Sequence, residues 1–158
     1  MITGARAAPA HGDDANSTLE FKMGEVRVKV RITNGMDEMR VKAGELKSED
    51  VRTFEGEALV DSGTVKTVIP ASVMQQLGIP IMSERPVRYA DGRIETVPVT
   101  GTIRVHIQNR DAIDEAYVLG DEILVGQTVL ECMDLHIDCN NRKLIPNPKY
   151  PDRPVLRV

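Results

Sequence analysis

The segment ALVDSGTVKTVIP, residues 58–70, places a carboxylate, a hydroxyl and a glycine directly after an apolar run. Leu59 and Val60 precede Asp61, and apolar residues also follow Gly63, so hydrophobic side chains wall this loop. A carboxylate held among apolar groups costs free energy unless a partner or a reaction uses it. Paired carboxylates serve general acid–base catalysis, whereas Asp, Ser and Gly are also ordinary turn residues. The tripeptide alone therefore leaves both a catalytic loop and a simple turn open.

The other reactive side chains have weaker patterns. His106 and His136 each lie in an alternating strand pattern, and no motif places a Ser or Cys nucleophile for them, so we assign both to strand faces. Cys132 and Cys139 are too few for a disulfide framework and lack the paired spacing of a zinc site. We expect both to be reduced packing residues. Nothing resembles a calcium loop or a phosphate cradle, so we predict neither a metal nor a cofactor.

Length and charge restrict the class of protein. A chain of 158 residues suits one domain with a sizeable core. Its net charge is −4, and acidic and basic residues are mixed along it, which argues against nucleic acid as a partner. No apolar stretch is long enough to span a bilayer, and residues 1–19 lack the apolar centre of a secretory signal. We therefore expect a cytoplasmic protein without a membrane partner.

Short strands dominate the elements that must position Asp61. In EVRVKVRIT, residues 25–33, apolar and charged residues alternate as in a half-buried strand. Similar patterns predict further strands at 51–60, 102–108, 112–119, through Val125, at 135–138 and around residues 144–145.

Helix and turn signals separate these strands. One short helix is expected between Pro70 and Gly78, and a second after a break at Gly126. Asn34-Gly35 marks a turn, and the charged residues 37–50 predict a long solvated excursion. Asp91-Gly92 between strand-like flanks predicts a hairpin with a two-residue loop, and residues 109–111 predict a further turn.

The sum predicts a mostly β domain, a small barrel or sandwich, rather than alternating βαβ units. We divide the chain into a flexible N-terminal tail at 1–19, a folded domain at 20–147 and an irregular C-terminal tail at 148–158. Prolines in the C-terminal tail disfavour a strand there. A faint internal echo, ALVD and ILVG, precedes each of the two expected helices.

The motif ALVDSGT, the hairpin at Asp91-Gly92 and the later ILVGQTVLE resemble, in order and spacing, the retroviral-type (retropepsin-like) aspartic proteases. The resemblance covers residues 22–146. It implies a small closed acid-protease barrel with one or two short helices, a β-hairpin flap and a homodimeric assembly. It also implies an aspartic endopeptidase that hydrolyses extended peptides with an Asp-activated water.

Such hydrolysis requires two carboxylates that share one proton. The chain contains a single Asp-Ser/Thr-Gly, so the second carboxylate must come from another copy, with Asp61 and its mate meeting on a two-fold axis. Like charges this close titrate as a coupled pair, and an acidic working range is expected. Because of the prolines after residue 147, a shared sheet between the copies is expected at 135–138 or 143–145.

The resemblance also implies roles for individual residues. Ser62 would bond across to the partner's backbone, and Gly63 would let the backbone approach the carboxylates. Thr64 stands where many single-domain members of that family have Ala, and its own hydroxyl is expected to bond the outer carboxylate oxygen. Substrate would contact the flap tip and the strand beside the catalytic loop, at Tyr89, Ala90, Asp91, Gly92, Leu124, Val125 and Gly126.

Two alternatives remain open from the sequence. One is a protease-like β module that binds an extended peptide or partner without cutting it. The other is a structural β-barrel in which Asp61 only begins a turn. For Tyr89, packing on the sheet as an edge-strand aromatic is as well supported as a flap role.

Overall fold

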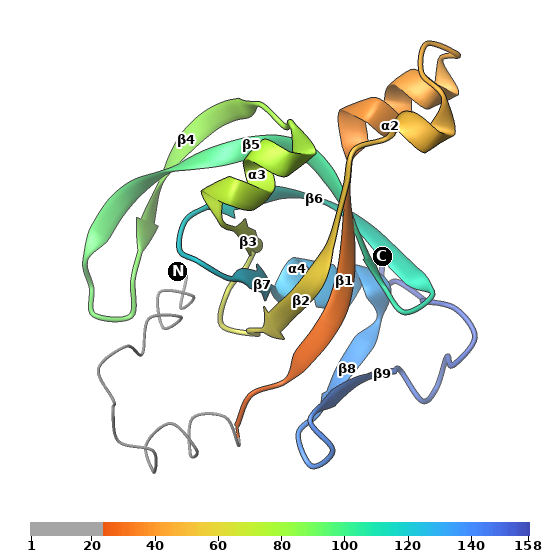
Figure 1. Ribbon diagram of the computed structural model, residues 1–158. Coiled ribbons are helices and arrows are strands. Elements are labelled where there is room, and N and C mark those ends of the chain that lie inside the picture. The colour runs from red at the N-terminus through yellow and green to blue at the C-terminus, as the bar shows by residue number, and fades with distance from the viewer. Residues whose placement is uncertain (1–23) are drawn as a thin grey trace.

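A closed six-stranded β-barrel forms the body of the protein (Figure 1). The computed structural model describes residues 24–158, so the expected N-terminal tail at 1–19 and the first residues of the expected domain lie outside the described residues. The prediction of a mostly β barrel is confirmed. The strands of the main sheet are β1 (Arg27–Asn34), β2 (Thr53–Val60), β3 (Thr67–Ile69), β4 (Ile81–Arg88), β5 (Ile94–Ile107), β6 (Arg110–Val118) and β7 (Ile123–Val125).

Strand β1 closes the barrel because it pairs on both of its edges. It runs antiparallel to β2, with Val28 opposite Ala58, and antiparallel to β5, with Ile32 opposite Val105. The remaining order, β2-β7-β3-β6-β5, completes the ring, and β4 extends the sheet beyond β5 as an outer strand. Pro86 and charged side chains on β4 are typical of an edge strand that resists pairing with other chains.

The two echoing segments of the sequence lie next to each other in this barrel. Strands β2 and β7 pair in parallel, with Ala58 opposite Ile123, Leu59 opposite Leu124 and Val60 opposite Val125. ALVD and ILVG therefore align residue by residue, and Asp61 follows β2 at the level at which Gly126 follows β7.

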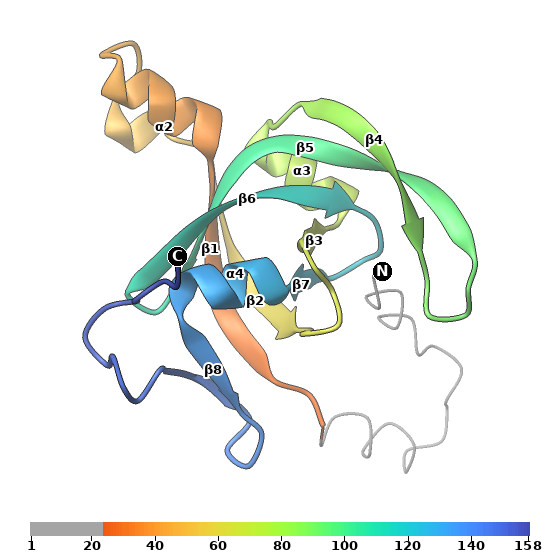
Figure 2. The same cartoon turned by 180° about the vertical axis from the view of Figure 1, so that it is seen from behind.

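Within residues 24–158, three short helices pack on or project from the barrel, one more than expected. Helices α3 (Ala71–Leu77) and α4 (Gln127–Met133) occur where the sequence predicts them, and Gly78 ends α3 in the left-handed conformation. Seen from behind, α4 lies beside β6 and β7 (Figure 2).

The charged stretch 37–50 projects from the barrel and is mostly exposed, as the predicted excursion does, but it is helical rather than irregular. It includes most of α2 (Gly35–Lys42) and the 3-10 turn η2 (Ser48–Asp50) (Figure 1). The turn expected at Asn34-Gly35 is a helix cap, since the Asn34 side chain accepts hydrogen bonds from the backbone N–H groups of Met36 and Asp37.

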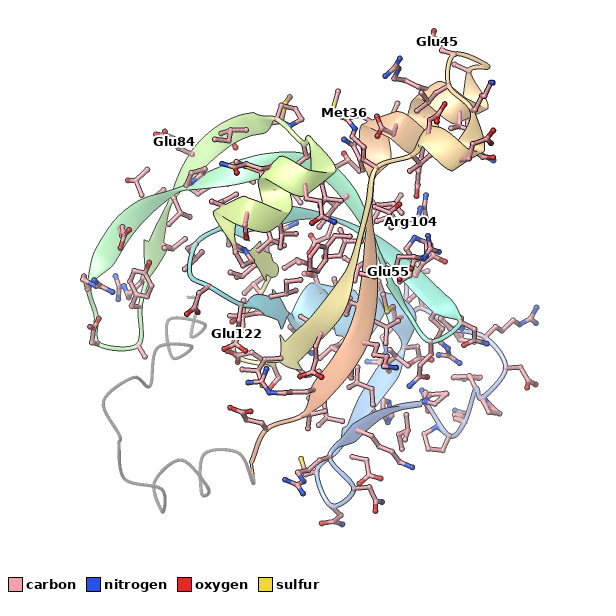
Figure 3. All side chains as sticks on the ribbon, viewed as in Figure 1. Met36, Glu45, Glu55, Glu84, Arg104 and Glu122 are labelled. Atoms are coloured by element: carbon pink, nitrogen blue, oxygen red, sulfur yellow. The ribbon has the colours of Figure 1, made fainter. Side chains whose placement is uncertain are left out.

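Two carboxylates attach α2 to the barrel. Asp37, 2% exposed at its side chain, forms a bidentate bond to the Arg52 guanidinium at 2.8 and 2.9 Å. Glu38 accepts hydrogen bonds from Thr33 and from Arg104 of β5, the latter at 2.7 Å. Arg104 lies below α2 in the view of Figure 3. The Arg52 bond lowers the pKa of Asp37 against the opposing effect of burial. Burial would raise the pKa of Glu38, but bonds from Arg104 and Thr33 outweigh it and leave the pKa low.

Two hydrophobic clusters fill the interior. The larger occupies the barrel and includes fully buried Ile32, Ile69, Leu77 and Ile103. The smaller lies between β3, β7 and the β4–β5 hairpin, and it comprises Val68, Val87, Tyr89, Val97 and Leu124 with partly buried Leu59, Tyr117 and Leu119. The smaller cluster thus joins the hairpin to the strands that flank Asp61.

The turns of two hairpins differ from expectation. Residues 89–93 connect β4 to β5, so the loop is longer than two residues; Gly92 donates to the Tyr89 carbonyl at a φ of 87°. Between β5 and β6 the chain turns at residues 108–109, one position earlier than expected, with Gln108 at a φ of 56°.

A separate two-stranded sheet, β8 (Leu135–Asp138) and β9 (Lys143–Pro146), follows α4. No helix or strand occurs between residues 147 and 158. That segment is nevertheless held by buried Arg110, whose guanidinium donates to the carbonyls of Met133, Asp134, Tyr150 and Pro151.

Two further observations concern residues 24–158. Cys132 and Cys139 are free, in agreement with the expected reduced state, but both are exposed, so the expectation that they are packing residues is wrong. Cys132 lies on the outer face of α4, and Cys139 follows β8. None of the helices in this part of the chain has the length and apolar character needed to span a membrane.

Acid should weaken the attachment of α2. Because the pKa values of Asp37 and Glu38 are lower in the folded state, the unfolded chain binds their protons more readily. Their stabilisation is fully present above the ordinary carboxyl pKa of about 4 and is lost as the pH falls through the lower folded values. Urea unfolding from neutral pH into this acidic range should show stability declining more steeply for the wild type than for Asp37→Asn. Parallel declines would contradict this assignment.

Candidate functional site

Asp61 leaves the end of β2 in a loop that its own strand neighbour holds in place. The Asp61 N–H donates to the Val125 carbonyl of β7 at 2.9 Å, which extends the parallel ladder by one residue. Within the loop, the Gly63 N–H donates to Asp61 Oδ1 at 3.0 Å and the Thr64 N–H to the Asp61 carbonyl at 3.1 Å. The carboxylate is half-buried and has a defined orientation relative to its loop.

The loop rests on Gly126 at the start of α4. A Cβ at this position would lie 2.6, 2.8 and 2.7 Å from the carbonyl oxygens of Thr64, Val65 and Lys66, so only glycine permits this approach. The next two residues bond the same loop. Gln127 N–H donates to the Thr64 carbonyl at 2.7 Å, and Thr128 N–H and Oγ1 donate to that of Val65 at 3.0 and 2.8 Å.

The loop turns its tip outward. Ser62 and Gly63 are exposed, and Val65 presents 47% of its surface to solvent. Thr64, in contrast, is fully buried, and its hydroxyl has no hydrogen-bond partner. The expected bond from this hydroxyl to the Asp61 carboxylate is therefore absent from the single chain.

Asp114 is a second carboxylate of the site, which the sequence reasoning missed. It is 5% exposed on β6 and accepts hydrogen bonds from Thr67 N–H at 3.0 Å and Thr67 Oγ1 at 2.8 Å. Lys66 forms an ion pair with its other oxygen at 3.2 Å. A signal existed in the strand pattern, because Asp114 alternates with Ala112 and Ala116 on the inward side.

The expected flap residues separate into two groups. Tyr89 is 5% exposed and packs in the smaller cluster with Leu124, while the Arg93 guanidinium lies 4.3 Å from its ring centroid. Burial raises the pKa of Tyr89, and a hydrogen bond with Glu95 adds to the effect. The turn residues Ala90, Asp91 and Gly92 are exposed, and Asp91 Oδ1 accepts from its own turn at Arg93 N–H.

The structure therefore brings some of the expected site residues together directly. Val125 and Gly126 contact the Asp61 loop, and Leu124 shares a hydrophobic cluster with Tyr89. The exposed turn residues stand at the far end of the β4–β5 hairpin, which arches away from the barrel (Figures 1 and 2).

A cleft of about 790 Å³ lies elsewhere, between β1, β2 and the β5–β6 turn. His106 lines it, half-buried on a strand face as expected, and desolvation together with nearby Arg31 lowers its pKa. None of the expected site residues lines this cleft, so its size does not connect it to Asp61. Across residues 24–158 no group of three or more His, Cys, Asp or Glu side chains is arranged to hold a metal ion.

Comparison with known proteins identifies no relative: no family model matches the chain, and no curated protein matches it. A function for this chain therefore has to be argued from the geometry of the Asp61 loop and the residues that support it.

Replacing Gly126 by Ala should disturb the Asp61 loop. The added Cβ would meet three backbone oxygens that cannot move independently, and overpacking of this kind costs about 1–3 kcal/mol of folding stability. Urea unfolding of Gly126→Ala measures the loss. Gly24→Ala is the matched control, because an added Cβ there has no atom within 4 Å. Equal stability of the two variants would show that the contact at Gly126 is loose.

Replacing Thr64 by Val should stabilise the single chain. The hydroxyl is buried without a partner, and exchanging it for a methyl group of similar shape removes a desolvation cost of about 1 kcal/mol. Thermal unfolding at low protein concentration measures the change. A loss of stability would instead reveal that this hydroxyl has a partner in solution.

Proposed function

We propose that this chain is one half of a homodimeric aspartic endopeptidase of the retropepsin-like type, with the active site formed by Asp61 and its symmetry mate. Its substrate is a peptide or protein segment in an extended conformation. The observation that carries the proposal is the loop at residues 61–66. A carboxylate is anchored through its backbone to two neighbouring elements, while the residues beside it, Ser62 and Gly63, are exposed.

The exposure of the loop tip supports an assembly across a two-fold axis. Gly63 has no side chain to hold the loops apart, and the Ser62 hydroxyl is accessible to a second backbone. Since the chain has one Asp-Ser/Thr-Gly, a second copy supplies the second carboxylate. The close contact of the Asp61 loop with Gly126 supports a catalytic role. Two carboxylates can share a proton productively only when the loops that carry them do not shift.

Hydrolysis then proceeds without a covalent intermediate. The ionised carboxylate takes a proton from a water molecule whose oxygen attacks the peptide carbonyl carbon, and the protonated carboxylate gives its proton to the carbonyl oxygen. The resulting diol then collapses: the amine nitrogen takes the proton of the pair, the C–N bond breaks, and one hydroxyl of the diol returns its proton to the pair as the carboxylic acid forms. The products are a carboxylic acid and an amine.

The β4–β5 hairpin is the element we assign to substrate closure. Val87 and Tyr89, next to its turn, pack in the smaller hydrophobic cluster with Leu124, whereas the turn itself, residues 90–92, is exposed and contains a glycine at positive φ. A hairpin with a short exposed turn, packed against the strand that precedes Gly126, suits a flap that excludes water from a bound peptide.

Cleavage of peptides by the pure protein tests the reaction. We expect wild-type protein, incubated with a diverse peptide pool from acidic to neutral pH, to produce new termini in mass spectra, with the greatest activity in the acidic range. Asp61→Asn should fold and cut nothing. Asp121→Asn, an exposed acid in the loop before β7, is the matched control and should cut as the wild type does.

A mixing experiment tests the shared site. Wild-type and Asp61→Asn chains are unfolded, mixed in equal amounts and refolded, so that about one quarter of the dimers hold both carboxylates. The activity of the mixture should then be about a quarter of that of pure wild-type protein at the same total protein concentration. A fall to about one half would mean that each chain works alone. Peptide binding without cleavage, unchanged in Asp61→Asn, would favour a non-catalytic binding module instead.

A further inference from the structure

We propose that Asp114 is a positioning residue of the Asp61 site, whose buried carboxylate fixes the exit of the catalytic loop and thereby the reactive geometry of Asp61. This inference rests on the proposed endopeptidase function. It assigns a task to a charged group that the hydrolytic mechanism itself does not use.

The location of Asp114 is unusual for an acid. Along β6, Ala112, Asp114 and Ala116 point inward and are buried, whereas Ile113 on the opposite face is 60% exposed. An ionised side chain facing inward is costly unless it is paired and hydrogen-bonded. Four polar atoms of three residues lie within 3.5 Å of this carboxylate, which offsets that cost.

These contacts terminate the loop at the point where β3 begins. The parallel pairing of β3 with β6 starts at Thr67 opposite Ala116, which is two residues beyond Asp114 on β6. Asp114 Oδ2 accepts from both the backbone N–H and the hydroxyl of Thr67, so a side-chain oxygen satisfies the first donor of the strand. The loop that starts at Asp61 therefore ends on a fixed residue.

The same carboxylate also contacts α4. Thr128 Oγ1 donates to the Val65 carbonyl at 2.8 Å and lies 3.5 Å from Asp114 Oδ2. Val125 holds the start of the loop at Asp61, and Gly126 and Gln127 contact it at residues 64–66. Asp114 holds the junction between the loop and β3, through Lys66 and Thr67. Loss of Asp114 would remove the side-chain support of this exit.

A carboxylate suits this position better than an amide. Oδ1 receives the Lys66 ammonium at 3.2 Å and Oδ2 receives both Thr67 donors, so donors approach both oxygens. An asparagine would offer one acceptor and turn its NH₂ toward either Lys66 or Thr67. Asp114→Asn is therefore expected to lose the contact with either Lys66 or Thr67, although it preserves the shape of the side chain.

The first measurement needs no substrate. Hydrogen exchange of the backbone amides in residues 61–67 should accelerate by about 10-fold or more in Asp114→Asn, because the Thr67 N–H loses its acceptor and the loop gains freedom. Glu115→Gln, the adjacent exposed acid on β6, is the matched control and should exchange as the wild type does. Unchanged exchange in Asp114→Asn would overturn the assignment.

The second measurement separates positioning from overall stability. Two peptide inhibitors are compared, one with a hydroxyl-bearing isostere in place of the scissile bond and one identical but without the hydroxyl, since only the hydroxyl requires both carboxylates in place. In Asp114→Asn, held well below its unfolding temperature, affinity for the first should fall about 10-fold or more and kcat should fall, while affinity for the second and KM stay unchanged.

Each outcome has a distinct meaning. An equal loss of affinity for both inhibitors, or an unchanged kcat, would show that Asp114 serves folding stability alone and would overturn the proposal. A wild-type protein that cuts no peptide would instead refute the endopeptidase function and with it the catalytic part of this inference. The exchange measurement would then still decide whether Asp114 fixes the loop.

Discussion

The candidate site depends on the close contact between Gly126 and the loop that carries Asp61. Three carbonyl oxygens, from residues 64–66, point at an α-carbon that bears no side chain. Their closeness allows the first turn of α4 to donate its otherwise unpaired N–H groups to the loop, which satisfies both partners at once. A loop with an exposed tip thereby gains backbone hydrogen bonds to its neighbours, as a strand has. The parallel pairing of β2 with β7 delivers both segments to this contact.

Much of the barrel is predictable from local patterns. Alternation along β1, the glycine stop of α3 and the break at Gly126 each depend on neighbouring residues alone. Helix α2 escapes prediction for the opposite reason. The sequence of this helix has no apolar face that would reveal it. The helix is held in place by the ion pairs of Asp37 with Arg52 and of Glu38 with Arg104, whose partners lie 15 and 66 residues apart in the chain. The signal Asn34-Gly35 suits a hairpin and a helix cap equally well.

The candidate site likewise contains some residues that local motifs reveal and others that only distant contacts make important. Asp61 and Gly126 can be found from the sequence because each belongs to a short contiguous motif, and their contact is a consequence of strand pairing. Asp114 has no motif and becomes significant only when β6 lies beside β3. Tyr89 is expected in the flap, but its burial depends on a cluster assembled from several strands. The unpaired hydroxyl of Thr64 and the exposure of both cysteines likewise depend on packing that spacing along the chain does not encode.

The guanidinium of Arg110 has a consequence for the order in which this fold matures on the ribosome. Two of its four carbonyl acceptors, those of Tyr150 and Pro151, follow it by 40 and 41 residues. During synthesis the strand β6 emerges well before them, and its cation must stay hydrated until that later segment arrives. Docking of the segment then expels this water, and the Arg110 guanidinium links the end of α4, the start of β6 and residues 150–151. Assembly of the barrel strands and docking of the C-terminal segment are in this way separate events in time.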